Sequence, residues 1–297
     1  MESCWNDTLY ELIARASTDL PGDVEDALRE ASERESDGSN AAQALYMMLE
    51  NVHLAREKRQ PLCQDTGALV FWVDAPPSLS EETFHQHAEG AIVNATEQGL
   101  LRQNSVDPLT GENSGTNLGP GSPVIHWHEA AARDTVRVSL LLKGGGCENV
   151  GVQYSLPDAR LGAGRDLNGV RRCALDATHR AQGRGCAPGV LGICIGGDRA
   201  TGYAESKRQF LRPLGDPSDV PALADLERTV LREANTLGIG PMGFGGETTL
   251  LGVHIGYLNR LPASYFVSIS YMCWSYRRHI IETDVHGQLI DATWRTS

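Results

Sequence analysis

Glycine is concentrated in five short segments of this chain, and these segments limit how the chain can fold. They are PLCQDTG at 61–67, NSGTNLGPGSP at 113–123, KGGGCEN at 143–149, GCAPGVLGICIGG at 185–197 and LGIGPMGFGGETT at 237–249. Glycine permits positive φ angles and a close approach of the backbone to a ligand. Each segment alone is compatible with an ordinary turn. Five together, three with or beside a cysteine, indicate loops that carry function. None is a nucleotide-binding glycine motif placed between a strand and a helix.

The apolar residues between these segments predict an α+β fold. Helices are expected at 7–17, 23–35, 41–58, 80–97, 168–182, 200–211 and 222–237, and strands at 68–73, 124–128, 135–142, 190–195, 250–255 and 266–272. A helical N-terminal part, about residues 1–60, is thus followed by a mixed sheet with surrounding helices. We expect one large domain over residues 1–297, because the most linker-like stretch, 215–221, is short and lies between two helices.

The charge balance excludes some classes of partner. The chain has 26 Lys and Arg against 38 Asp and Glu, a formal net charge of −12, so nucleic acid and anionic membranes are not expected partners. No apolar stretch approaches the roughly 18 residues of a membrane span, and the first residues lack the pattern of an export signal. We expect a soluble cytoplasmic protein.

Seven cysteines are scattered along the chain. An odd number without an export signal argues against a disulfide framework. Cys63, Cys186 and Cys273 lie in or beside irregular polar segments, where a packed thiol and a metal ligand are both plausible. Their separations are unlike the compact spacings of zinc fingers or ferredoxins. A shared site would have to be assembled by the fold from three distant loops.

Six sequence blocks carry a family resemblance. In chain order they are CQDTG, NSGTNLG, KGGGCEN, GCAPGVLGICIGG, LGIGPMGFGGETTLLGVHI and CWSYRR. This set, from about residue 41 to 278, resembles the iron–sulfur hydro-lyase family of class I fumarate hydratases and L-tartrate dehydratases, in particular the alpha subunit of the two-subunit forms. The resemblance implies a 4Fe-4S cluster with one iron free of protein ligands. The implied ligands are Cys63, Cys186 and Cys273, with Cys147 and Cys194 as nearby alternatives.

The resemblance also implies substrate-facing residues. Asp65 would take part in proton transfer, while Gln64 and Thr66 would hydrogen-bond the substrate. Arg102 would clamp a carboxylate, for which a planar guanidinium is well suited. Lys143 and Gly145 belong to the KGGG loop, whose backbone N–H groups would face the same anion. The weaker candidates are His126, His128, Arg277 and Arg278, and His254 is expected in the core.

The leading hypothesis is reversible hydration of fumarate to (S)-malate, and dehydration of L-tartrate to oxaloacetate is the alternative. Ala187 and Asp198 depart from the family pattern, so the substrate-facing edge is expected to differ. Few residues follow Arg278, so the resemblance implies a separate beta subunit with further catalytic groups, and hence a heterooligomer acting on a small dicarboxylate. Two other classes stay open, a zinc- or thiol-stabilised interaction protein without activity and a thiol nucleophile at Cys63.

Overall fold

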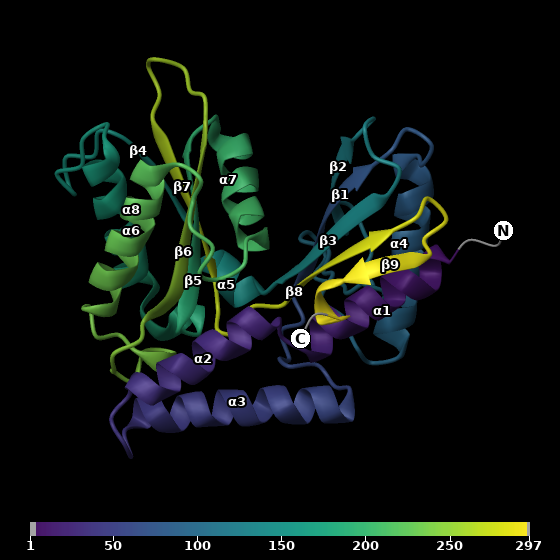
Figure 1. Ribbon diagram of the computed structural model, residues 1–297, viewed down its shortest axis with the longest axis horizontal. Helices are drawn as coiled ribbons and strands as arrows, with labels where there is room; N and C mark the ends of the chain where they lie inside the picture. The colour runs from purple at the N-terminus through teal and green to yellow at the C-terminus, as the bar shows by residue number, and fades with distance from the viewer. Residues whose placement is uncertain (1–3, 296–297) are drawn as a thin grey trace. The chain divides into compact units, whose positions relative to one another are not determined.

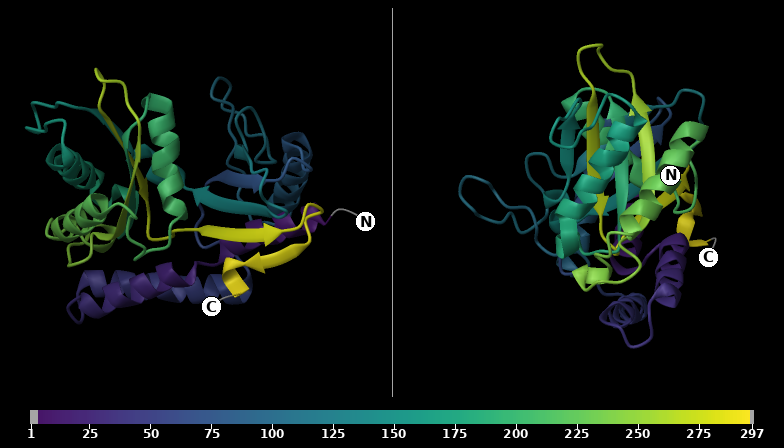
Figure 2. Two further views of the ribbon diagram at one scale, coloured as in Figure 1. Left: turned by 45° about the horizontal axis from the view of Figure 1, so that its top comes forward. Right: turned by 90° about the vertical axis from the view of Figure 1, so that its left-hand side faces the viewer.

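The computed structural model describes residues 4–295, which fall into two compact units. Unit 1 contains Met1–Gly22, Glu50–Gly145 and Ser275–Ser297, and unit 2 contains Asp23–Leu49 and Gly146–Trp274. Figures 1 and 2 show the elements of both. A division by contacts does not show whether the two units fold separately. The single large domain over residues 1–297 therefore stays a prediction.

Unit 1 is built on a five-stranded mixed sheet. Its order is β2 (Val124–Glu129), β1 (Ala68–Ala75), β3 (Val136–Lys143), β8 (Arg278–Thr283) and β9 (Leu289–Ala292). Only β1 and β2 run parallel. Ala68 pairs with Lys143, and Leu141 pairs with Arg278. This register brings the start of β1, the end of β3 and the start of β8 to one end of the sheet, where three of the sequence blocks adjoin the strands.

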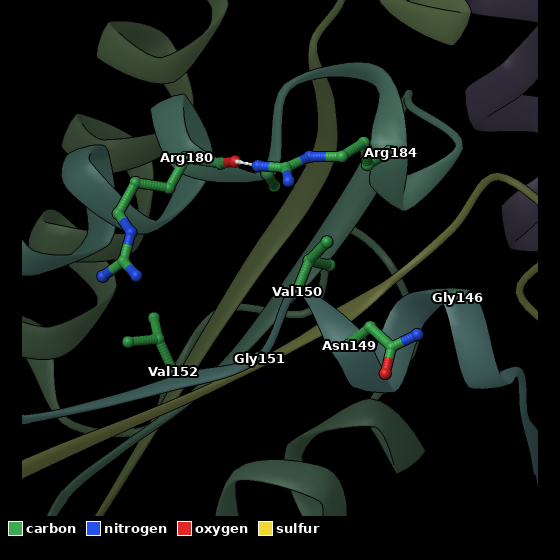
Figure 3. Close-up of a pocket in the computed structure, with 8 residues that line it drawn as sticks. Gly146, Asn149, Val150, Gly151, Val152, Arg180 and Arg184 are labelled. Atoms are coloured by element: carbon green, nitrogen blue, oxygen red, sulfur yellow. Dashed lines mark hydrogen bonds between the residues drawn. The ribbon is translucent and has the colours of Figure 1, made fainter.

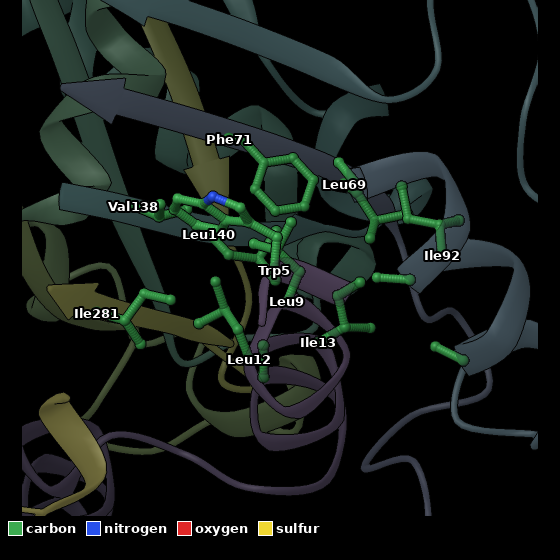
Figure 4. Close-up of a cluster of buried hydrophobic side chains, with 14 of the residues drawn as sticks. Trp5, Leu9, Leu12, Ile13, Leu69, Phe71, Ile92, Val138, Leu140 and Ile281 are labelled. Atoms are coloured by element: carbon green, nitrogen blue, oxygen red, sulfur yellow. The ribbon is translucent and has the colours of Figure 1, made fainter. Parts of the chain in front are cut away.

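The core of unit 1 lies between this sheet and two helices, α1 (Trp5–Thr18) and α4 (Glu81–Glu97). Alternate residues of β3, including Val138 and Leu140, point into it, as expected for a strand with one face on a core. Figure 4 shows Trp5 and Leu9 of α1 among these strand side chains. The Trp5 ring meets Phe84 edge-on at 5.4 Å between centroids, a favourable aromatic geometry.

Unit 2 is built on a four-stranded mixed sheet covered by helices on both faces. Its order is β4 (Val152–Ser155), β7 (Phe266–Met272), β5 (Gly189–Gly196) and β6 (Leu250–Leu258), with β5 and β6 parallel. The helices α6 (Leu167–Ala181) and α8 (Pro221–Asn235) cover one face, and α7 (Arg199–Arg208) covers the other (Figure 1). Because both faces are covered, every residue of β5 is buried.

The remaining elements connect these layers. They are α2 (Gly22–Arg34), α3 (Asn40–Lys58), α5 (Gly145–Asn149) and the 3-10 helices η1 (Gln182–Gly185), η2 (Gln209–Leu211), η3 (Pro241–Gly243) and η4 (Thr293–Arg295). Within unit 2, the Glu35 carboxylate after α2 accepts hydrogen bonds from the N–H groups of Glu247 and Thr248, at 3.0 Å each. This contact fixes the GGETT part of the last glycine segment.

The predicted α+β class is confirmed, and every predicted helix and strand is present. The strands form two mixed sheets where we expected one. The elements that the prediction missed are β4, α5, β8, β9 and the 3-10 helices η1, η3 and η4. Strand β3 ends at Lys143, directly before the glycine run, and the short helix α5 begins within that run at Gly145. In the part of the chain that the structure describes, no helix is both long enough and apolar enough to cross a membrane.

Candidate functional site

The CQDTG loop of unit 1 lies directly on the backbone of the KGGG segment. Gly67 has φ of +82°, and a Cβ there would lie 2.8 Å from the carbonyl carbon of Lys143. A Cβ on Gly144 would lie 2.9 Å from Oδ2 of Asp65, and one on Gly145 would lie 3.8 Å from the same atom. Glycine is therefore favoured at 67 by its backbone conformation, and a side chain at 144 would displace the Asp65 carboxylate. The structure thus brings together Asp65, Lys143 and Gly145.

Thr66 links this loop to the segment that carries Arg102. The Thr66 side chain is buried, and its Oγ1 accepts hydrogen bonds from the Arg102 backbone N–H at 3.1 Å and from Asn104 Nδ2 at 2.8 Å. Asn117, from the NSGTNLG block, donates through Nδ2 to the Arg102 carbonyl at 2.9 Å. The backbone of Arg102 is therefore held on both sides while its side chain is exposed. Sequence reasoning missed Asn104 and Asn117, although the NSGTNLG block pointed to the second.

Cys63 and Gln64 are the first two residues of the CQDTG loop. The preceding residue, Leu62, donates its N–H to the Ser17 carbonyl at 2.9 Å, and its own carbonyl accepts from Asn51 Nδ2 at 2.8 Å. These bonds anchor the start of the loop to unit 1. Cys63 is half-buried and Gln64 is exposed, so both side chains are available for a ligand.

Cys186 and Cys273 are neighbours within unit 2. Cys186 follows η1 in the left-handed backbone region, with φ of 53°, and Cys273 follows β7. The Trp274 N–H donates to the Cys186 carbonyl at 3.2 Å, which ties the two cysteine segments together. Left-handed residues other than glycine are uncommon and occur often at functional sites.

Tyr271 of β7 lies among three thiols of unit 2. Its ring packs so closely on Gly185 and Gly189 that a Cβ would lie 2.5 Å and 2.2 Å from ring atoms. Burial raises the pKa of Tyr271, and the nearby charges of Cys147, Cys273 and Cys186 raise it further. The phenol therefore stays neutral, and Cys147, like Cys186 and Cys273, lies near this tyrosine.

The remaining cysteines are in different surroundings. Cys173 in α6 and Cys194 in β5 are fully buried, and burial raises the pKa of each thiol to about 12. A metal ligand must be a thiolate, so both are poor ligands. Cys194 lies inside strand β5, whereas Cys147 lies in α5 near Tyr271. Cys4 lies at the N-terminus of α1 in unit 1.

The three predicted ligands are divided between the units, with Cys63 in unit 1 and Cys186 and Cys273 in unit 2. Within residues 4–295, no three His, Cys, Asp or Glu side chains lie close enough together to hold a metal ion. The chemistry of the donor set nevertheless suits an iron–sulfur cluster, because soft thiolates are its usual ligands.

The weaker candidates occupy mixed positions. His126 stacks on Trp72 at 5.0 Å between centroids, and His128 pairs with Asp74 at 3.0 Å, so both lie along the paired strands β1 and β2. His254 is buried in β6, as predicted. The Arg278 guanidinium lies over the Tyr276 ring at 4.5 Å. In contrast, Arg277 contacts the CQDTG loop, through a hydrogen bond from Nη2 to the Asp65 carbonyl at 2.7 Å.

Unit 2 also contains a positively charged pocket of about 430 Å³ (Figure 3). The residues that line it are Gly146, Asn149, Val150, Gly151, Val152, Arg180, Ala181 and Arg184. Arg184 donates through Nη2 to the Arg180 carbonyl at 2.6 Å, and Arg180 lies 3.8 Å from Asp176. Gly146 and Arg184 stand one and two residues before Cys147 and Cys186. The two guanidinium groups make this pocket suitable for an anion close to the thiol segments.

Asp198, one of the two departures from the family pattern, caps helix α7. Its carboxylate accepts from the N–H groups of Ala200 at 2.7 Å and Thr201 at 2.9 Å, while Thr201 Oγ1 accepts from the Asp198 N–H at 3.0 Å. This is a complete capping box. The other departure, Ala187, is buried, and its carbonyl accepts from the Met242 N–H at 2.8 Å. These contacts assign both residues to local structure in unit 2.

We expect Asp198→Ala to lower the melting temperature without reducing activity. Hydrogen bonds from the N–H groups of Thr201 and Ala200 hold the pKa of Asp198 below its ordinary value of 3.8. The charged cap therefore stabilises the fold fully above pH 3.8, and this contribution is lost as the pH falls through the lowered pKa. Melting curves of the wild type and the variant should differ at pH 7 and converge in strong acid. A variant with unchanged melting at pH 7 and reduced activity would instead place Asp198 at the substrate.

Comparison with known proteins agrees with the sequence blocks. The family model described as fumarate hydratase (Fumerase) matches residues 6–282. A Geobacillus stearothermophilus protein, provisionally named as a class I fumarate hydratase, is 47% identical over 96% of this chain and 56% of its own length. A Methanocaldococcus jannaschii protein, provisionally named L(+)-tartrate dehydratase subunit alpha, is 34% identical over 96% of this chain and 99% of its own. An Escherichia coli protein named L(+)-tartrate dehydratase subunit alpha is 30% identical over 93% of this chain and 89% of its own length.

These names are those of hydro-lyases, enzymes that add or remove water at a carbon–carbon double bond. The chain spans only about half the length of the Geobacillus relative and most of the length of the other two. The family model covers nearly the whole described chain, which confirms the resemblance found in the sequence. The chain therefore belongs to the fumarate hydratase family.

Proposed function

We propose that this chain is the alpha subunit of a 4Fe-4S hydro-lyase that reversibly hydrates fumarate to (S)-malate. The observation that carries the proposal is the contact of the Asp65 carboxylate with Gly144 at the end of β3, beside Lys143 and Gly145. The Asp65 carboxylate can give or accept a proton, and the KGGG segment beside it can receive an anion. The relative with the class I fumarate hydratase name supports fumarate as substrate.

In this proposal Cys63, Cys186 and Cys273 hold the cluster. The thiolate donor set fits iron, and Cys147 is a further thiol near Tyr271, as Cys186 and Cys273 are. When bound, the cluster supplies a Lewis acid that polarises an oxygen of the substrate.

The residues of unit 1 would bind the substrate and move its proton. Asp65 would exchange a proton with the substrate at Oδ2, the oxygen that faces Gly144. Arg102, whose backbone Thr66 holds, would bind a carboxylate with its exposed guanidinium. Gln64 would donate an amide hydrogen bond. The backbone N–H group of Gly145 and the Lys143 ammonium would attract the same dianion.

A separate beta subunit and a cytoplasmic location belong to the same proposal. Two relatives that match over most of their length are named as alpha subunits, and the Geobacillus relative extends well beyond the matched part. We expect the partner to supply the remaining substrate-binding and proton-transfer groups of a heterooligomer. The partners are then a beta subunit and a small dicarboxylate.

Dehydration of L-tartrate to oxaloacetate is the second candidate, and the two relatives named for it favour it. The test is to co-express the chain with its beta subunit without oxygen, measure iron, acid-labile sulfide and zinc, and assay both substrates. Turnover of fumarate supports the first candidate, and turnover of tartrate alone supports the second. A full cluster without activity on either would refute both. Zinc without sulfide would favour the interaction protein instead.

We expect Gly144→Ala to lower kcat/KM by roughly 10- to 100-fold, because its Cβ would displace the Asp65 carboxylate and small misplacements of reacting groups are costly. The added atom meets the end of a side chain, so the fold should persist. Gly146→Ala is the matched control, since a Cβ there has nothing within 4 Å. Equal activity of the two variants, at equal iron content, would contradict the placement of Asp65.

A further inference from the structure

Arg277 is a buried guanidinium with unused hydrogen-bond donors. Its side chain is among the largest fully buried ones, at 1% exposure. One nitrogen, Nη2, donates to the Asp65 carbonyl at 2.7 Å. Within the described residues, Nε and Nη1 have no hydrogen-bond partner, and Arg277 forms no ion pair. These two nitrogens carry three of the five N–H donors of the side chain.

Such an arrangement is costly for the protein alone. A guanidinium keeps its charge at any pH that the protein meets, and a buried charge without a counter-charge is strongly unfavourable. The Asp65 carboxylate does not serve as partner, because its Oδ2 faces Gly144 while only its backbone carbonyl meets Arg277. The free donors therefore point to an anionic ligand.

Arg277 lies within the candidate site of unit 1. The Leu142 N–H donates to the Arg277 carbonyl at 3.0 Å, which places Arg277 beside the end of β3. Lys143, which follows Leu142 at the end of β3, is also buried, at 3% exposure. Two buried cations thus adjoin the loop that carries Asp65.

We propose that Arg277 binds one carboxylate of the dicarboxylate substrate. The hydrogen bond from Arg277 to the Asp65 carbonyl would at the same time fix the position of Asp65 relative to that carboxylate. This proposal rests on the proposed function. It makes Arg277 a substrate-binding residue that also positions the CQDTG loop. A bidentate guanidinium–carboxylate contact would satisfy the free donors and distinguish two-carboxylate from one-carboxylate ligands.

The test compares succinate with butanoate, which has the same carbon chain but lacks one carboxylate. Their affinities for the anaerobically prepared complex are measured by titration calorimetry for the wild type, Arg277→Gln, Arg277→Lys and the control Arg137→Lys. Arg137 is exposed and lies near the opposite end of β3 from Lys143. We expect the wild type and the control to prefer succinate, and Arg277→Gln to lower this preference roughly 10- to 100-fold. Arg277→Lys, which keeps the charge without the planar fork, should give an intermediate preference.

A purely structural role of Arg277 would weaken both ligands equally and leave the preference unchanged, which would overturn the proposal. Melting temperatures show whether Arg277→Gln folds. If it does not fold, the test is whether Arg277→Lys has a lower preference for succinate over butanoate than the wild type. The hydratase assay is separate. If Arg277→Gln loses the preference for succinate but the wild-type complex turns over neither fumarate nor tartrate, the carboxylate site is supported and the proposed reaction is refuted. If the wild-type complex turns over substrate but Arg277→Gln keeps the preference, the proposed reaction is supported and the carboxylate site is refuted.

Discussion

Replacing Cys63, Cys186 or Cys273 with serine should in each case abolish stable binding of iron and sulfide. A hydroxyl is a much harder and less acidic ligand than a thiol, so it does not replace a thiolate on iron. The substitution changes little else. In Cys186→Ser, for example, the backbone carbonyl can still accept from the Trp274 N–H. We therefore expect folded chains with iron and acid-labile sulfide near background and no hydratase activity.

The measurement is iron and acid-labile sulfide per chain after anaerobic preparation, together with the cluster absorption spectrum. Cys4→Ser and Cys173→Ser are the controls and should keep the cluster, because Cys4 lies at the start of α1 and Cys173 is a neutral thiol in the core of unit 2. Full iron content in Cys186→Ser would direct attention to Cys147, which lies near the same tyrosine. Loss of activity with full iron in Cys63→Ser would instead support thiol catalysis.

The regular elements of this chain were predictable because their apolar residues repeat with the period of the element. Helix α4 shows this directly, and strand β3 combines an alternating start with a continuous apolar run, which is typical of a buried strand. The missed elements lack such a pattern. Strand β8 begins with Arg278 and His279, whose burial depends on distant residues, and β4 is only four residues long. Helix α5 starts inside a glycine run, which local propensity disfavours.

The residues of the candidate site were partly predictable from the sequence, but the contacts that support them were not. The sequence blocks pointed to Asp65, Lys143 and Gly145, and the structure brings these residues together in unit 1. The role of Thr66 as the support of Arg102 depends on a contact across 36 positions, which no local pattern reveals. The same holds for Arg277, whose contact with Asp65 spans 212 positions. The register of β1, β3 and β8 brings Arg277 to Asp65, whereas the contact of Thr66 with Arg102 depends on the path of the chain after α4.

Asp65→Asn should lower kcat by about 100- to 10,000-fold while the iron and sulfide content stays unchanged. Positioned acid–base groups contribute about this much to catalysis. An amide cannot exchange the proton, yet it has nearly the same shape as the carboxyl group, so the contact with Gly144 is kept. The measurement is kcat and KM of the anaerobically prepared complex on the substrate that it turns over. Asp74→Asn is the control, because Asp74 lies on β1 in the same unit and pairs with His128.

The division of the effect between kcat and KM identifies what Asp65 does. A group that acts only in the transition state lowers kcat and kcat/KM equally when it is removed. A negative charge that merely repels the substrate dianion would instead give a lower KM in Asp65→Asn, with kcat retained. Asp65→Glu tests position, because the acid is kept but its longer side chain must pass the backbone of Gly144. We expect it to be slower than the wild type and faster than Asp65→Asn. If Asp65→Asn turned over substrate as fast as the wild type, proton transfer would have to be assigned to the beta subunit alone, with Asp65 a structural part of the loop.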